Sequence, residues 1–295
     1  MFTVIGIAVV FGAILAGYLM EHGQLLVLFQ PAEFIIIFGA SLGTILIANP
    51  FPVAVRLLKD SLAVFKGDAR NKSFYLENLK MLNELFGYAH KNGLPKLESD
   101  VDEPAKSAIF SKYKGFLKNA HAVHFICDTL RMFITAGVDP FELDQMMELD
   151  MEVHHHEAQR PVSALTSTAD ALPGLGIVAA VLGIVITMGA LGGPPEEIGR
   201  KVAAALVGTF LGILLCYGLF GPIASRMTSI NESEAQYYHV MRVGILAFIR
   251  GSAPILAVEF ARRAIPSSVR PTFSELEATC RRSASPAGSA QAAAA

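Results

Sequence analysis

Apolar residues gather in four stretches along the chain, and polar residues fill the segments between them. The four stretches cover residues 2–20, 33–48, 171–191 and 202–223. Each is close to the roughly 20 residues that a helix needs to cross a bilayer. The second stretch is the shortest, so we expect it to tilt or to use residues 25–29 to complete its crossing. The pattern predicts an all-α membrane protein with four transmembrane helices.

Composition and charge support this prediction and orient the chain. Hydrophobic residues make up 53% of the 295 positions, which is more than one soluble core of this size usually needs. Of the 24 Lys and Arg residues, only Arg200 and Lys201 lie outside segments 49–170 and 224–295. Because basic segments tend to stay in the cytoplasm, we expect both segments and both termini on the cytoplasmic side.

The polar segments are predicted to form a helical cytoplasmic domain. Two apolar stripes with helical spacing predict helices that end at Gly93 and Gly137. A third helix is predicted to begin at Asp139 and Pro140, because Asp can cap a helix and Pro fits its first turn. The stripes are Tyr75, Leu79, Leu82 and Phe86 in the first helix, and Val123, Ile126, Leu130 and Phe133 in the second.

We therefore expect five regions along the chain. The helical pattern of the fourth span continues without a break signal to Gly251, so this span is expected to extend into the cytoplasm. The regions are transmembrane helices 1 and 2 (1–50), the cytoplasmic helical domain (51–169), transmembrane helices 3 and 4 (170–223), cytoplasmic C-terminal helices (224–282) and a disordered tail (283–295).

The four apolar stretches hold almost no ionisable residues. Such residues occur only at the edges, as Glu33, Asp170 and Lys201. Since an ion-coupled pump needs an ionisable group at membrane depth, a proton relay here would need a carboxylate from a partner chain. The alternative is that the stretches only anchor a cytoplasmic domain.

Two features of the third and fourth stretches argue against simple anchoring. Pro173 and Pro222 each remove a helix hydrogen bond and can form a hinge, although prolines at helix boundaries would also explain them. Small residues recur at spacings that let helices approach closely. They are Gly176, Ala179, Ala180, Gly183, Gly208 and Gly212, with Thr209 in the same stripe.

Patterns typical of catalysis are absent from the sequence, which has no nucleophile elbow, phosphate loop or HExxH motif. The consecutive His154, His155 and His156 would point in different directions on a helix, which does not favour a metal site. We expect no enzymatic activity, no cofactor, no metal and no nucleic-acid partner. A solvated helix face explains the remaining residues with ligand-like spacing, which are His121, His124, Cys127 and Asp128.

Several longer motifs, spread from residue 17 to 277, resemble those of motility protein A, the stator subunit family of bacterial flagellar motors. These motifs are specific in combination, and the resemblance covers almost the whole chain. They are GYLM (17–20), FQPAE (29–33), LPGLGIVAA (172–180), VGTFLGILL (207–215), AVEF (257–260), RPTF (270–273) and ELE (275–277).

The resemblance implies a multi-pass protein of the bacterial inner membrane that forms a proton channel and converts ion flow into torque. Five such chains would surround two copies of motility protein B, which binds peptidoglycan and supplies an ion-binding Asp. That partner would provide the carboxylate that the spans lack. Pro173 and Pro222 would act as hinges when this Asp is protonated, and lipid would surround the assembly.

The resemblance also implies roles for single residues. In this family a basic residue and a glutamate contact the rotor switch protein FliG, and Glu98 matches the glutamate. Where the family commonly has Arg, this sequence has His90 followed by Lys91. Either could carry the basic contact, and Lys91 is the expected one because histidine is only partly charged near neutral pH. Sodium-driven relatives tend to have a hydroxyl residue at the position of Ala180, next to Thr209, so proton coupling is expected.

Rival interpretations differ in topology. A proton-channel subunit that energises outer-membrane transport shares the logic of span prolines and a charged partner, but usually has three spans and an outside N-terminus. A secondary transporter would need more spans and polar groups at the membrane midplane. A membrane-anchored scaffold that conducts nothing predicts that Pro173 can be replaced without loss of function.

Overall fold

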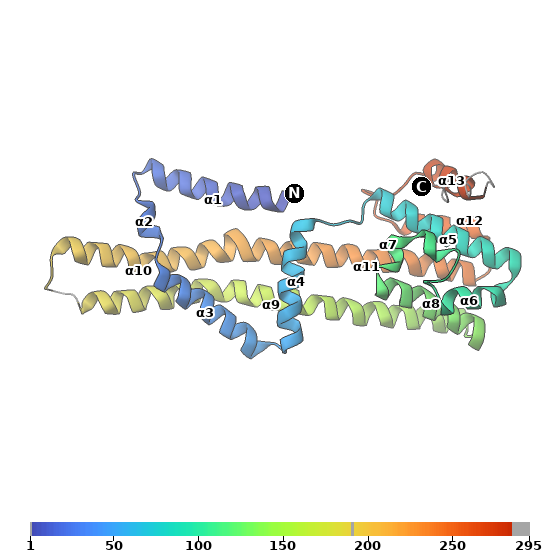
Figure 1. The fold of residues 1–295 in the computed structure, drawn as a ribbon, viewed down its shortest axis with the longest axis horizontal. Coiled ribbons are helices and arrows are strands. Elements are labelled where there is room, and N and C mark those ends of the chain that lie inside the picture. The colour runs from blue at the N-terminus through green and yellow to red at the C-terminus, as the bar shows by residue number, and fades with distance from the viewer. Residues whose placement is uncertain (1, 190–191, 285–295) are drawn as a thin grey trace. The chain divides into compact units, whose positions relative to one another are not determined.

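The computed structural model describes residues 2–189 and 192–284, and every regular element in these ranges is helical (Figure 1). The chain divides into two compact units. Unit 1 consists of Met1–Gly67 and Glu157–Asn231, and unit 2 consists of Asp68–His156 and Glu232–Ala295. Two long helices contribute residues to both units: α9 (Pro140–Met188) and α11 (Gly221–Ile249).

Among the described residues, four helical segments are long and apolar enough to cross a membrane, which confirms the predicted number of spans. The first is α1 (Phe2–Met20), with the predicted bounds. The second consists of the short helix α2 (Leu25–Leu28) followed by α3 (Pro31–Ala48), so residues 25–28 do extend the second crossing. The third and fourth lie within α9 and within α10 (Pro195–Leu215) together with its continuation into α11.

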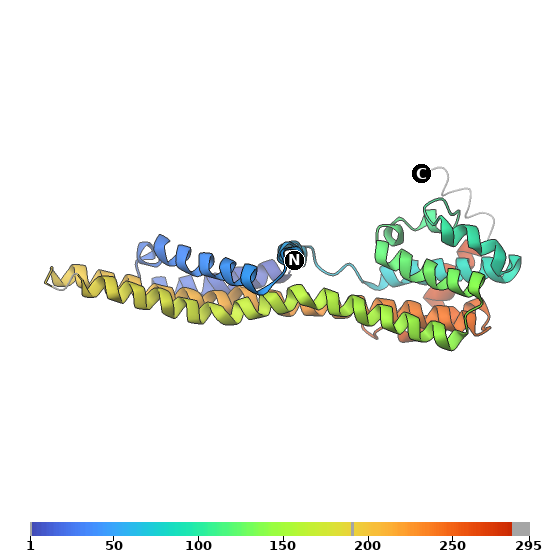
Figure 2. The same cartoon turned by 90° about the horizontal axis from the view of Figure 1, so that it is seen from below.

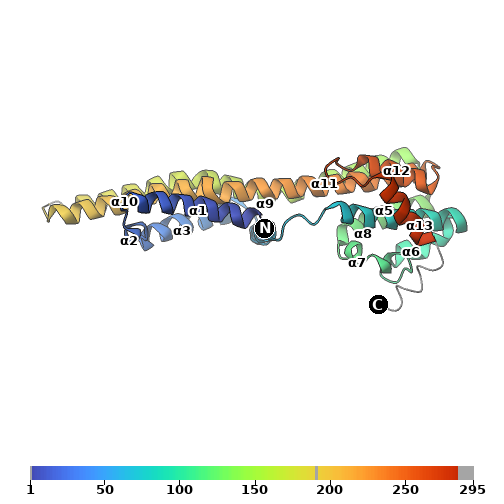
Figure 3. The ribbon, with the colours of Figure 1, turned by 90° about the horizontal axis from the view of Figure 1, so that it is seen from above.

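The helices of unit 1 pack around α9 and α10. The helices α2 and α3 lie against α10 (Figure 2). Ile37 of α3 is buried together with Leu172 of α9 and Leu211 of α10. The helix α1 lies beside the residues that follow α10 (Figure 3). Most other apolar side chains of α1 and α3 are exposed, as expected for helices whose solvent is lipid.

Helix α4 (Phe51–Ala63) lies in unit 1, whereas the sequence pattern placed residues 51–169 together in the cytoplasmic domain. It is followed by the 3₁₀ turn η1 (Val64–Lys66). Leu57 and Val64 pack against Val162 and Met227 in a small core. Because this contact depends on residues about 100 or more positions apart, the local pattern of α4 does not reveal it.

Unit 2 is built around one face of α5 (Lys72–Asn92). The predicted stripe of Tyr75, Leu79, Leu82 and Phe86 is fully or almost fully buried. Helices α12 (Pro254–Ala264) and α13 (Phe273–Ala284) pack against α5, and the ring of Phe86 stacks on Phe248 of α11 at 4.4 Å between centroids. The remaining elements are η2 (Leu94–Leu97), α6 (Glu98–Asp102), η3 (Phe110–Lys112), α7 (Lys114–Leu117) and α8 (Ala120–Ala136).

The predicted helix ends are confirmed where a local signal specifies them. Helix α5 stops before Gly93 (φ 85°) and α8 before Gly137 (φ 61°), two positive angles that glycine adopts readily. The side chain of Asp139 caps the start of α9 by accepting a hydrogen bond from the Phe141 amide at 2.8 Å.

Three expectations about the ends of regions need comment. The boundary expected between residues 169 and 170 falls inside α9, which continues through Pro161 and Pro173 without interruption. The helical continuation after the fourth span is confirmed to Ile249. Of the tail expected from residue 283, residues 283 and 284 belong to α13, and residues 285–295 lie outside the described part of the chain.

Candidate ion-path and coupling sites

The spans α9 and α10 approach each other backbone to backbone. A Cβ atom added to Gly176 would lie 2.6 Å from the carbonyl oxygen of Gly208, and one added to Gly212 would lie 2.5 Å from that of Leu172. A Cβ on Gly183 would lie 2.7 Å from the side chain of Ala205. Larger side chains would therefore separate the two helices, and the predicted close packing by small residues is confirmed.

Ala180 and Thr209 both lie at this contact between α9 and α10. A Cβ added to Gly208 would be 3.2 Å from the backbone nitrogen of Ala180, and one added to Gly176 would be 3.3 Å from the Cα atom of Thr209. Ala180 is buried and Thr209 is half-buried. Further along α9, the hydroxyl of Thr187 donates a hydrogen bond to the carbonyl oxygen of Gly183 at 2.8 Å. The structure therefore places the two predicted residues in one region.

Glu33 lies in the same region, although the sequence pattern placed it at the edge of a span. Its carboxylate is buried, and a Cβ on Gly208 would be 2.5 Å from its Oε2 atom. Gly208, which marks where the Glu33 carboxylate meets α10, lies 13 residues beyond Pro195, the first residue of that helix, or about 20 Å along its axis. Oε2 has no hydrogen-bond partner among the described residues. Because a buried carboxylate without a partner is costly, a proton or a cation would stabilise it.

Pro173 and Pro222 border the packed part of this helix pair. Leu172, which precedes Pro173, packs against Leu215 and Cys216, which precede Pro222. The chain from Cys216 to Phe220 forms a π-helical stretch, closed by a hydrogen bond from the Gly221 amide to the Cys216 carbonyl. Pro222 cannot donate the next α-helical hydrogen bond, which accounts for a rearranged turn at this point.

The π-helical stretch was not predicted. The glycines at 218 and 221 and the proline at 222 were the available signals, but each is also compatible with an ordinary helix. Pro173, by contrast, sits inside a continuous helix. The two prolines therefore differ in their backbone, and only Pro222 follows a segment with altered hydrogen bonding.

The residues predicted to contact the rotor lie at the surface of unit 2. His90 and Lys91 are exposed in the last turn of α5, where the positive charge of Lys91 interacts favourably with the helix dipole. Glu98 is exposed at the start of α6. Lys91, but not His90, borders a cavity of about 300 Å³ beside Glu84 and Lys112. The structure thus leaves all three side chains accessible.

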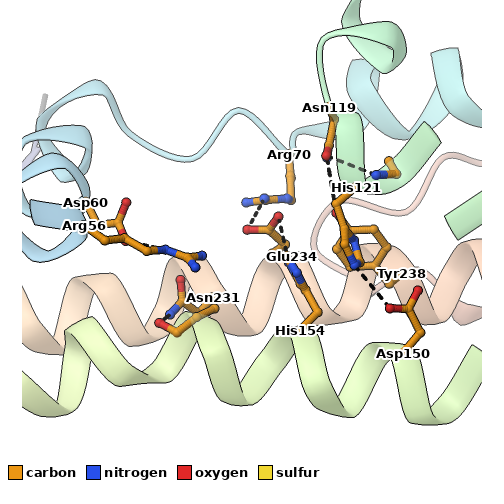
Figure 4. A network of polar contacts seen from close by, with 12 residues as sticks. Arg56, Asp60, Arg70, Asn119, His121, Asp150, His154, Asn231, Glu234 and Tyr238 are labelled. Carbon is orange, nitrogen blue, oxygen red and sulfur yellow. Dashed lines mark hydrogen bonds and ion pairs between the residues drawn. The ribbon is translucent and has the colours of Figure 1, made fainter. Parts of the chain in front are cut away.

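Unit 2 also holds a polar cluster that the sequence did not reveal (Figure 4). The rings of His121 (α8) and His154 (α9) stack with centroids 3.8 Å apart, and Tyr238 of α11 contacts both edge-on. His154 Nε2 lies 3.5 Å from a carboxylate oxygen of Glu234, which is also paired with Arg70 at 3.0 Å.

Neighbouring charges and burial shift the pKa values in this cluster in opposite directions. Burial, helped by the neighbouring His154, lowers the pKa of His121, although Asp150 at 3.5 Å works against this shift. Burial tends to raise the pKa of Glu234, but the contacts with His154 and Arg70 outweigh it and leave that pKa lowered. The cluster therefore favours an ionised Glu234 next to a neutral His121.

The histidines do not form a metal centre within the described residues, where no group of three potential ligands converges. His121 faces Asp150 rather than His124, and His124 lies 3.7 Å from Asp128 on its own helix. Cys127 is buried, and burial raises the pKa of its thiol to about 12, which disfavours the thiolate that a metal would bind.

Comparison with known proteins places this arrangement among characterised families. Residues 4–93 match the family described as motility protein A N-terminal, and residues 116–239 match the MotA/TolQ/ExbB proton channel family. The chain is 37% identical to motility protein A of Escherichia coli K12 over 94% of both chains. It is 34% identical to the chemotaxis protein LafT of Vibrio parahaemolyticus, over 92% of this chain and 96% of LafT.

Solved structures show the same fold. The C. jejuni MotAB structure superimposes with a TM-score of 0.75 at 19% identity, over 92% of this chain and 98% of that chain. The MotAB stator complex of Bacillus subtilis gives 0.72 at 23% identity, over 90% and 96%. Four helical spans with a tightly packed third and fourth span define a multi-pass membrane protein of a proton-channel class. Within that class, the chain belongs to the motility protein A family.

Proposed function

We propose that this chain is the motility protein A subunit of a flagellar stator, which conducts protons with motility protein B and exerts torque on the rotor. The 37% identity to a motility protein A over 94% of the chain supports this role. The structural observation that carries it is the glycine contact between α9 and α10, which gathers Ala180, Thr209 and Glu33.

The helix pair needs a partner to complete an ion path. From Ala171 to Met188, the part that packs on α10, the third span carries no ionisable residue. A carboxylate from motility protein B would supply the missing ion-binding group, and a ring of five chains around two such partners would surround it. We propose that Glu33, buried without a partner at this contact, belongs to the ion path as well.

Motion would pass from the ion path to the rotor through continuous helices. Both α9 and α11 contribute residues to unit 1 and to unit 2, so a change of packing near Pro173 or Pro222 acts on helices that also build unit 2. Glu98 and a basic residue at 90 or 91 would then contact FliG electrostatically. The role is that of a channel and force generator rather than an enzyme.

The orientation follows from charge. We propose that the protein lies in the bacterial inner membrane, with exposed apolar side chains of α1 and α3 against lipid and both termini in the cytoplasm. The loop between α9 and α10 and the loop after α1 would then face the periplasm.

The test is rotation of tethered cells in a strain that lacks its own subunit and co-expresses the cognate motility protein B. The parent chain is expected to restore rotation, and Pro173→Ala to lose most of it, because alanine restores the missing helix hydrogen bond. Pro161→Ala changes another proline inside the same helix and is expected to retain rotation.

Membrane insertion of each variant is confirmed by fractionation. If the parent chain inserts correctly but the cells do not rotate, this would contradict the stator role and favour the channel that energises outer-membrane transport. Full rotation by Pro173→Ala would contradict the hinge and favour a passive scaffold.

A further inference from the structure

An apolar stripe on the first part of α9 faces away from the core of unit 2. Glu142, Met146, Leu149 and Val153 follow one another at i, i+4, i+7 and i+11, so they share one helix face. The three apolar members are between 47% and 61% exposed. Leu143 and Met147, which point the other way, are buried in the core. The four residues Glu142, Met146, Leu149 and Val153, which we call the α9 stripe, are therefore not part of the core of unit 2.

The α9 stripe borders a groove that is also partly apolar. A cavity of about 300 Å³ between α8 and α9 is lined by Met132, Met146 and Met147, together with the carboxylates Asp128 and Asp150. Methionine side chains adapt to the shape of a partner, and such surfaces commonly bind helices. Met146 belongs to both the stripe and the groove, and the acidic residues Asp128 and Asp150 lie beside it.

A second exposed apolar face lies on α12. Ile255, Leu256 and Phe260 are between 43% and 48% exposed, whereas Ala257 and Val258 of the same helix are fully buried. Phe260 also lines a cavity of about 350 Å³ with Val243 and Leu246 of α11, next to the ion pair of Arg250 and Asp144. We call Ile255, Leu256 and Phe260 the α12 face.

The two surfaces carry opposite charge. Residues 140–159 contain six Asp and Glu residues and no Lys or Arg, and two of these, Asp144 and Glu148, are paired within the chain with Arg242 and Arg250. On α12, Arg262 and Arg263 share a single acidic partner, Glu259, so this helix carries excess positive charge. Glu142 forms no ion pair within the described residues. Arg263, one turn beyond Phe260, pairs with Glu259 at 2.8 Å and keeps a side chain that is 74% exposed. Each surface therefore offers charge that the other can neutralise.

We propose that the α9 stripe of one chain packs on the α12 face of a second copy of the same chain. This inference rests on the proposed ring and names the contact that would build it. Because the two surfaces are different, the contact is head-to-tail, and repetition of such a contact closes into a ring when the rotation allows it. Two α9 stripes facing each other would bring acidic residues together, and an anionic lipid surface would repel them.

Cysteine crosslinking in membranes tests the contact. The chain carrying both Leu149→Cys and Phe260→Cys, co-expressed with motility protein B, is oxidised mildly and separated under denaturing conditions. We expect a ladder of crosslinked species, because every copy then offers one cysteine to each neighbour. The native Cys127, Cys216 and Cys280 are buried, so the parent chain gives the baseline.

Three controls make the result specific. Leu149→Cys alone and Phe260→Cys alone are expected to remain uncrosslinked, and a mixture of the two single variants to give dimers only. Leu149→Cys with Lys106→Cys, a side chain that is 77% exposed elsewhere on unit 2, is expected to give no ladder. Glu142→Arg and Arg263→Glu should each lower the yield severalfold in the crosslinking chain, and their combination should recover part of it.

Dimers from Leu149→Cys alone would overturn the proposal, because they would show a symmetric contact. Absence of a ladder from the double variant in cells that still rotate would also overturn it, while leaving the stator role intact. A ladder in cells that do not rotate would support the contact and count against the stator role instead. Rotation is therefore scored in the same cells as crosslinking.

Discussion

At the scale of single residues, His121 shows how unit 2 holds a titratable side chain in its neutral form. Its ring stacks on that of His154 and meets Tyr238 edge-on, and its Nδ1 atom has no hydrogen-bond partner among the described residues. Asp150 and Glu234 favour its protonation, but burial and the second histidine outweigh them and keep its pKa lowered. Protonation would place a charge where the surroundings do not solvate it.

We therefore predict that unit 2 loses stability as the pH falls through the ordinary histidine pKa of about 6.5. Since the pKa of His121 is lower in the folded chain, the unfolded chain binds more protons in this range, and stability rises with pH. Thermal unfolding of the full chain in detergent, measured between about pH 5.5 and about pH 7.5, checks this.

The matched variant is His121→Phe, which keeps a ring against His154 but cannot take up a proton. It is expected to flatten the pH dependence of the melting temperature in this range. An unchanged slope in the variant would contradict the prediction, because it would assign the dependence to another group. Glu234, whose pKa is lowered, loses its stabilising charge only below about pH 4.5, so it does not interfere.

At the scale of elements, the contact between α9 and α10 depends on the absence of side chains. Gly176 and Gly208 meet across this contact, and the Cβ of an alanine at 176 would overlap a backbone carbonyl that cannot rotate away. Gly174 lies two residues earlier on the same helix, where a Cβ would meet nothing within 4 Å. Comparing alanine substitutions at the two glycines therefore separates the effect of the contact from the effect of helix propensity.

Gly176→Ala is expected to destabilise the helix pair by about 1–3 kcal/mol through overpacking. Gly174→Ala should be neutral or stabilise the helix by up to about 1 kcal/mol, because alanine favours a helix over glycine. Thermal stability in detergent and tethered-cell rotation are measured for both variants. Equal loss of stability in the two would contradict the proposed role of the contact.

The elements also show what a sequence can and cannot predict. The ends of α5 and α8 were predicted because Gly93 and Gly137 act locally, on the last turn of their own helices. The position of Glu33 was not, because Gly183 and Gly208, which face it, lie at least 150 residues away in sequence. The histidine cluster was missed for the same reason, since His121 and Tyr238 belong to helices that are distant along the chain.

At the scale of the whole molecule, the family resemblance indicated a function, which the apolar pattern alone could not do. The pattern predicted four spans, and the structure confirms them. It left a simple membrane anchor as an alternative, and membership of the motility protein A family now argues against that alternative. Residues 90, 91 and 98 are accessible, which is compatible with a rotor contact and leaves their role a prediction.

The identity of the coupling ion is decided by the whole assembly, but this chain contributes its side of the path. Ala180 is buried at the contact between α9 and α10 and offers no side-chain oxygen to a cation, so the side-chain oxygens of this region are the Thr209 hydroxyl and the Glu33 carboxylate. Hard cations need several oxygen ligands to replace their water, so a path with few oxygens favours protons.

We predict that replacing external sodium by potassium, at constant proton motive force, leaves the rotation speed of tethered cells unchanged. A protonophore added at constant sodium should stop rotation. Rotation that stops in potassium and resumes with sodium would contradict proton coupling, and it would show that oxygen ligands from the partner chain outweigh the missing hydroxyl at Ala180.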